Sequence, residues 1–202
     1  MRQGYYGFYW TLPVPWYGFV RLSSRPAIAA RQSRTIAYCR NRVRAHVRQA
    51  GGRMLGEVAL MEAEPDRGSP ELAAEFRRLL DKAQREGARV AVVDFSDHRN
   101  WRRHWELSRH YEHPACDVIE ADPAEVQLSH FNPWAHFEEW RERTRANIAG
   151  KGDHRAQILA ALETVEGSFP VRAAALNLME LKTHGGKPWT GDNLRKFLQA
   201  GG

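Results

Sequence analysis

The sequence predicts an α/β protein in which a parallel-sheet domain is followed by a small all-α region of helix-turn-helix type. Strand and helix patterns alternate between residues 16 and 125, and only helical patterns follow in residues 126–202. Residues 90–95 (VAVVDF) are almost wholly apolar, which is typical of a central parallel strand covered on both faces. The length of 202 residues fits one ordinary domain and a small appendage.

The first 15 residues are expected to form an aromatic arm, because they are rich in Tyr and Trp and contain two prolines. Packing of these rings over a hydrophobic edge is favoured over stacking on nucleic-acid bases. Residues 17–22 (YGFVRL) read as the first strand, since turn residues flank them. A helix is predicted over residues 27–50, where apolar residues recur at steps of three and four before Gly51-Gly52 ends it.

The remaining elements of the sheet domain follow in alternation. The patterns predict strands at 54–61, 90–95 and 117–121, with helices at 70–86 and 101–111 between them. Such a βαβ series builds a parallel sheet, and ligand chemistry then gathers at the carboxyl ends of the strands.

Charge is strongly segregated along the chain, whose net charge is +6. Residues 1–56 contain ten arginines and no Asp or Glu, and the first acid is Glu57. This pattern predicts a polyanionic partner, with double-stranded DNA as the expected one; a genome that favours Arg codons is the alternative. Arg40, Arg44 and Arg48 fall on one helix face and repel one another unless an anion compensates them.

Several classes of protein are excluded. Two cysteines cannot build a disulfide scaffold, and no apolar run is long enough to span a membrane, so we expect a cytoplasmic protein without membrane contact. A zinc site at His110, His113 and Cys116 is disfavoured because Pro114 breaks the segment and no fourth ligand is well placed. No cofactor is expected.

The predicted strand ends bring hydroxyls and guanidinium groups together. Arg21 and Ser23 follow the first predicted strand, Arg67 follows the second, and Arg99 and Arg102 follow the third. A serine can attack a phosphodiester if guanidinium groups neutralise the transition state. The alternative is that Arg21, Arg67 and Arg99 form surface ion pairs with Glu62, Asp66 and Asp97.

Arg21-x-Ser23, Gln32 nine residues later, and Asp66-Arg67 resemble the catalytic domain of the serine recombinase (resolvase/invertase) family. The resemblance implies a resolvase-like sheet domain with its first strand in the sheet interior. It also implies that Ser23 forms a phosphoserine bond with DNA during recombination, while Arg21 and Arg67 bind the scissile phosphate. Arg99 and Arg102 complete the implied catalytic set.

Residues 170–198 resemble the helical DNA-binding domain of large serine recombinases, through segments 174–177, 185–190 and 193–198. Thr190 is predicted to cap the last helix. The Glu-Arg-Thr-Arg segment at 142–145 matches the end of the family's long helix. A plain helical protein-interaction module is the alternative. The DNA-binding residues that this resemblance implies are Arg143, Arg145, Lys187, Trp189, Thr190, Asn193, Arg195 and Lys196.

The sequence also departs from the family pattern. The Arg99-x-x-Arg102 pair is displaced by one residue, and His136-Phe137 replaces an expected Glu-Arg pair. The long helix that builds the family's dimer starts late here, after Asn132-Pro133, and is therefore shortened. A homodimer is one of the arrangements that the sequence leaves open. Two hypotheses follow: a divergent recombinase that cleaves and rejoins DNA through Ser23, or a catalytically inactive, recombinase-derived DNA-binding or regulatory protein.

Overall fold

The computed structural model describes residues 2–63, 68–95, 104–121 and 131–200. The chain divides into two compact units. The first, here called the sheet unit, comprises residues 1–13 and 20–133; the second, the helical unit, comprises residues 14–19 and 134–202. Each unit is described separately.

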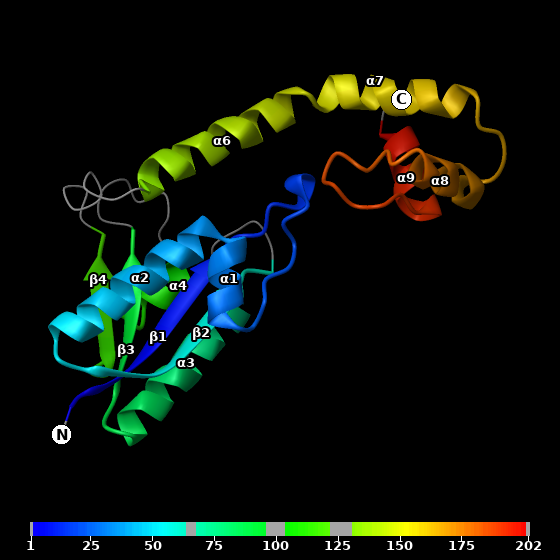
Figure 1. Ribbon diagram of the computed structural model, residues 1–202. Helices are drawn as coiled ribbons and strands as arrows, with labels where there is room; N and C mark the ends of the chain where they lie inside the picture. Colours follow the sequence, from blue (N-terminus) through cyan, green and yellow to red (C-terminus); the bar gives the residue numbers. More distant parts are fainter. Residues whose placement is uncertain (1, 64–67, 96–103, 122–130, 201–202) are drawn as a thin grey trace. The chain divides into compact units, whose positions relative to one another are not determined.

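The sheet unit contains four strands: β1 (Gly4–Thr11), β2 (Arg53–Met61), β3 (Arg89–Asp94) and β4 (Cys116–Glu120). They form one parallel sheet in the order β2-β1-β3-β4 (Figure 1). The predicted α/β class and the strands at 54–61, 90–95 and 117–121 are therefore confirmed, with small shifts at their ends.

The prediction for the first strand is wrong. The strand lies at Gly4–Thr11, inside the segment expected to be an aromatic arm, and not at residues 17–22. β1 is buried along its whole length because β2 and β3 flank it and helices cover both faces. Aromatic residues fill such a strand well. Residues 17–22 instead contain the end of a short 3-10 helix, η1 (Pro15–Tyr17), and Gly18 in a left-handed conformation.

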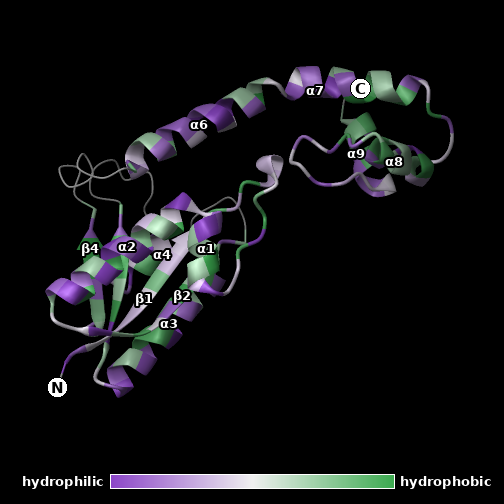
Figure 2. Ribbon diagram, in the orientation of Figure 1, coloured by the Kyte–Doolittle hydropathy of each residue, from purple (hydrophilic) through white to green (hydrophobic). Residues whose placement is uncertain are grey.

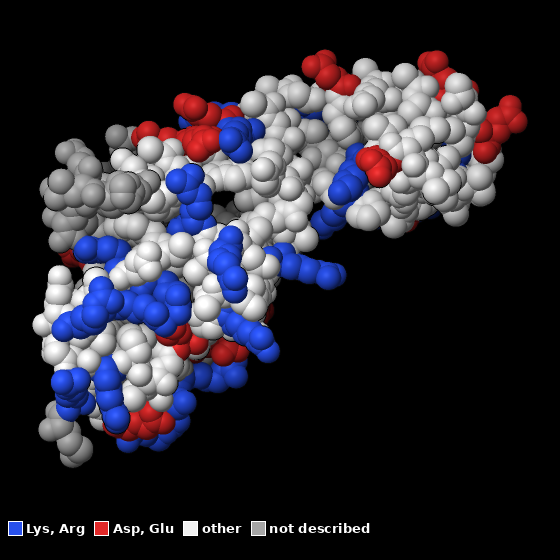
Figure 3. All heavy atoms as spheres, viewed as in Figure 1, with Lys and Arg blue, Asp and Glu red and all other residues white. Residues whose placement is uncertain are grey.

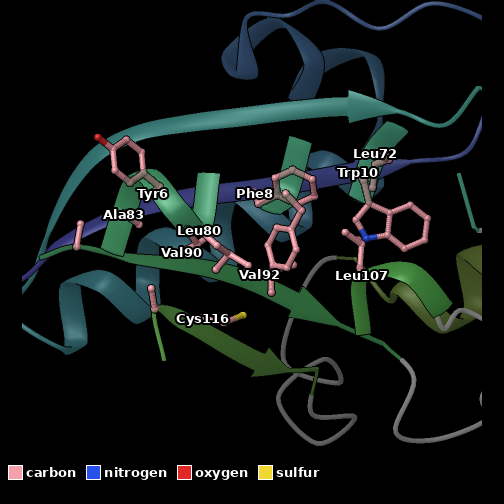
Figure 4. Packing of buried hydrophobic residues seen from close by; sticks show 13 residues of the cluster. Tyr6, Phe8, Trp10, Leu72, Leu80, Ala83, Val90, Val92, Leu107 and Cys116 are labelled. Atoms are coloured by element: carbon pink, nitrogen blue, oxygen red, sulfur yellow. The ribbon is translucent and has the colours of Figure 1, made fainter. Parts of the chain in front are cut away.

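Side chains alternate across β1 and supply the core on both faces. Tyr6, Phe8 and Trp10 join the cluster beneath α3 (Pro70–Arg85), which Figure 4 shows from close by. This cluster also includes Leu72, Phe76, Leu80, Val90, Val92 and Leu107. The opposite face of β1 is covered by α2 (Arg34–Gln49). The aromatic rings of residues 4–11 therefore pack in the core, on the two faces of a central strand, and not over a hydrophobic edge.

The single helix predicted over 27–50 is two helices, α1 (Pro26–Gln32) and α2. Ser33 separates them: its backbone is extended, and its hydroxyl accepts a hydrogen bond from the Ile36 N–H at 3.3 Å. The sequence pattern does not show this break, because the apolar spacing continues across it. The helix predicted at 101–111 is reduced to α4 (Trp105–Ser108) within the described residues.

The helical unit contains most of α6 (Pro133–Ala149), together with α7 (Lys151–Glu163), α8 (Phe169–Leu178) and α9 (Gly191–Gln199). Its core is formed by Ile158, Leu162, Ala173, Leu176, Trp189 and Leu194. Figure 2 shows that α6 is mostly hydrophilic, whereas α8 is largely hydrophobic. In the described part of the chain, no helix combines the length and apolar character needed to cross a membrane.

Candidate nucleic-acid interface

The predicted catalytic role places Ser23 at the end of a strand. In the structure, Ser23 lies instead in the loop that leads into α1. Its backbone N–H donates to Oε1 of Gln32 at 2.8 Å, which joins the two residues that the sequence pattern had paired. Its hydroxyl accepts from the Arg25 N–H at 3.2 Å. These two bonds hold the serine in place on a loop that also carries Arg21.

The remaining predicted catalytic arginines, Arg67, Arg99 and Arg102, lie outside the described residues. Of the acids proposed as alternative ion-pair partners, Asp66 and Asp97 also lie outside them. The third, Glu62, is buried and contacts His104 instead of Arg21.

Exposed arginines surround the Ser23 loop and continue along α1 and α2. Figure 3 shows basic side chains gathered over this part of the sheet unit. Arg34 stacks on the Phe131 ring, with its Cζ 4.6 Å from the ring centroid. Within the described residues, four of these exposed arginines make neither an ion pair nor a ring contact. They form the surface that we call the arginine face, with members Arg21, Arg25, Arg31 and Arg48.

Two arginines of the predicted stripe, Arg40 and Arg44, are partly neutralised by one carboxylate that they share. Each donates from Nε and one terminal nitrogen to both oxygens of Glu57, at 2.7–3.1 Å. The Tyr9 hydroxyl donates to the same carboxylate at 2.9 Å. Burial raises the pKa of Glu57, but hydrogen bonds from Arg44, Arg40 and Tyr9 outweigh it and bring the pKa to about 2. Glu57 is thus the anion that the stripe requires.

A second buried polar group, whose pairing the sequence does not indicate, lies at the carboxyl edge of the sheet. Nε2 of His104 is 2.5 Å from Oε1 of Glu62, and both side chains are fully buried. The His104 Nδ1 accepts from the Leu107 N–H at 3.2 Å and so caps α4. The hydroxyl of Thr11, at the end of β1, lies 3.5 Å from that of Ser33.

In the helical unit, three predicted DNA-binding residues have structural roles. Trp189 is 4% exposed and belongs to the core. Thr190 caps α9 as predicted, because its hydroxyl accepts a hydrogen bond from the Asn193 N–H. In the reciprocal bond, Oδ1 of Asn193 accepts from the Thr190 N–H at 2.7 Å. Asn193 also donates to the Pro188 carbonyl at 3.1 Å, so its amide is occupied within the turn.

The charged members of the predicted DNA-binding set lie on the surface. Arg143 pairs with Glu139 at 2.5 Å, and Arg195 and Lys196 both pair with Asp192, at 2.7 and 2.8 Å. These exposed pairs are weak and exchange readily with other anions. Lys187 and Arg145 are exposed and have no ion pair with a described residue.

The residues that suggested a zinc site, His110, His113 and Cys116, do not form a metal centre with any other described residue. Burial, with a smaller effect of Asp117, raises the pKa of the Cys116 thiol to about 12. The His113 Nδ1 accepts from the Ala115 N–H at 3.1 Å. Within the described residues, no three His, Cys, Asp or Glu side chains are grouped to hold a metal ion.

The chain matches no protein-family model, no curated protein and no solved structure.

Proposed function

We propose that this protein binds double-stranded DNA through the arginine face of its sheet unit, assisted by basic side chains of the helical unit. One observation carries the proposal: the four exposed arginines of the arginine face make no ion pair with any described residue. Exposed guanidinium groups of one sign repel one another, and phosphate oxygens relieve that repulsion.

The position of Glu57 supports the same proposal. This acid lies in β2 and pairs with Arg40 and Arg44 of α2, where its one negative charge offsets one of their two positive charges. The arginine face therefore keeps its charge while the inner part of the stripe is stabilised. Positive charge that no acid of the protein offsets attracts an anion from outside the protein.

Kinship with serine recombinases is part of the proposal. The sheet is parallel with an interior first strand, although that strand is β1 and not the segment that carries Arg21 and Ser23. The hydrogen bond between Ser23 and Gln32 joins two residues of the motif on which the resemblance rests. The same resemblance assigns Lys187, Arg145, Arg195 and Lys196 to DNA contacts in the helical unit. Trp189, Thr190 and Asn193 support these contacts from within, since they form the core and the cap of α9.

Binding of a labelled blunt duplex, measured by fluorescence anisotropy over a range of salt, tests the proposal. We expect log K to fall linearly with log salt, with a slope of about −0.9 for each phosphate contact. Arg31→Ala and Arg48→Ala each lower affinity and reduce the magnitude of that slope by about 0.9. Arg85→Ala on α3 removes an exposed arginine from the other face of the sheet and serves as the control. A complex insensitive to salt contradicts the proposal.

Catalysis by Ser23 is the second candidate, supported by the two hydrogen bonds that fix the serine beside exposed Arg21. In that reaction the Ser23 hydroxyl loses its proton, Oγ bonds to phosphorus and a sugar hydroxyl leaves as the phosphodiester breaks. A nicked suicide substrate traps this adduct. A covalent complex with the wild type that disappears in Ser23→Ala supports a recombinase. Duplex binding without any adduct favours the catalytically inactive alternative.

A further inference from the structure

A rigid hairpin finger, residues Val14–Phe19, belongs to the helical unit. Val14 and Phe19 form a bridge in which each N–H donates to the other's carbonyl, at 2.7 and 3.1 Å. Gly18 closes the tip at a φ of +83°, with its N–H bonded to the Pro15 carbonyl at 2.9 Å. The short 3-10 turn between these bonds fixes the backbone of Trp16 and Tyr17.

The finger is anchored to α6 and to the turn before α9. Ring centroids of Trp16 and Tyr17 lie 5.9 and 5.1 Å from that of Trp140, and the Tyr17 ring meets Trp140 edge to face. Gly186 approaches so closely that a Cβ there would lie 2.1 Å from the Pro15 carbonyl oxygen. These contacts place the two finger aromatics on a firm support.

Tyr17 is nevertheless 62% exposed. Trp140 supports its edge, and the Arg143 guanidinium lies 5.1 Å from the Trp140 centroid. A large ring held rigidly toward solvent has little conformational entropy to lose when a flat ligand stacks on it. Aromatic rings beside cations form the stacking platforms of proteins that bind single-stranded nucleic acids.

We propose that Tyr17, supported by Trp16 and Trp140, stacks on an unpaired nucleobase of single-stranded DNA. The inference rests on the proposed DNA binding, because it adds contact with an unpaired base, made by the helical unit, to a protein that binds the duplex. DNA is favoured over a proline-rich peptide because the Arg143 guanidinium lies over the Trp140 ring, its exposed pair with Glu139 exchanges readily with phosphate, and the chain carries a net charge of +6. Stacking is indifferent to base identity, so the site discriminates unpaired from paired bases and not one sequence from another.

The test uses an oligothymidylate with one central 2-aminopurine, whose fluorescence falls when it stacks on an aromatic ring. We expect quenching by the wild type and by Tyr17→Phe. Tyr17→Ala abolishes the quenching and weakens binding of the single strand about tenfold. Leu178→Ala is the matched control, because Leu178 is 86% exposed in the same unit and its truncation leaves binding unchanged. Unaltered quenching in Tyr17→Ala overturns the inference.

The blunt duplex separates this inference from the proposed function. Tyr17→Ala leaves duplex affinity and its salt slope unchanged, whereas Arg31→Ala lowers both. If the wild type fails to bind duplex but still shows quenching that depends on Tyr17, the proposed function fails and the stacking site stands. If a proline-rich peptide binds in a Tyr17-dependent way and the single strand does not, the stacking site is refuted.

Discussion

Asn177 holds the backbone of Trp189 by both of its polar groups. Its Oδ1 accepts from the Trp189 N–H and its Nδ2 donates to the Trp189 carbonyl, each at 2.8 Å. This amide joins the end of α8 to the turn before α9, so that the Trp189 ring enters the core against Phe197. Asn177, the last residue of segment 174–177, thus clamps the end of α8 to the turn before α9.

Asn177→Ala is expected to loosen this turn. Two hydrogen bonds of about 0.5–1.5 kcal/mol each are lost, so the helical unit loses about 1–3 kcal/mol of stability. Amide hydrogen exchange at Trp189 is the direct measurement, because that N–H becomes unprotected. Leu178→Ala removes a neighbouring exposed side chain and leaves the exchange rate as it was. Protection of Trp189 retained in Asn177→Ala contradicts the role of the clamp.

The depressed pKa of Glu57 predicts an acid-sensitive sheet unit. Its pKa falls from the ordinary 4.5 to about 2 in the folded protein. The stabilisation is therefore complete above pH 4.5 and is lost as the pH falls toward 2. We expect a loss of about 2 kcal/mol across this window, since part of the network is screened by solvent. Urea unfolding at several pH values measures it, and Glu57→Gln removes this part of the pH dependence.

The same substitution tests the arginine face from the opposite direction. Glu57→Gln deprives Arg40 and Arg44 of their anion, and Arg44 is the more exposed of the two, at 40% of its side chain. Duplex affinity is expected to rise, with a salt slope steeper by up to about 0.9 for each released guanidinium. Stability falls at the same time. An unchanged salt slope of duplex binding in folded Glu57→Gln shows that Arg40 and Arg44 do not contact DNA.

The sequence predicted most of the sheet unit because helix and strand periodicities are local and strong there. It failed at β1, whose Tyr and Trp residues read as a loose aromatic arm before two prolines, although they alternate between two buried faces. The sequence also indicated that the arginine stripe needs an anion, and Glu57, the first acid in the chain, supplies it. The partners of Glu62 and Asn177 were unpredictable, since each contact joins segments distant in sequence.

The buried contact between Glu62 and His104 yields the last prediction. His104→Phe leaves a carboxylate fully buried without its partner, which costs about 3–5 kcal/mol. Glu62→Gln added to His104→Phe removes the buried charge, so the double variant is expected to unfold at a higher urea concentration than His104→Phe alone. His110→Phe, at a half-buried histidine without an ion pair to any described residue, is the control. If the double variant is no more stable than His104→Phe, the uncompensated charge of Glu62 is not what destabilises the single variant. His104 then stabilises the protein mainly by capping α4 and by its ring contact with Trp10.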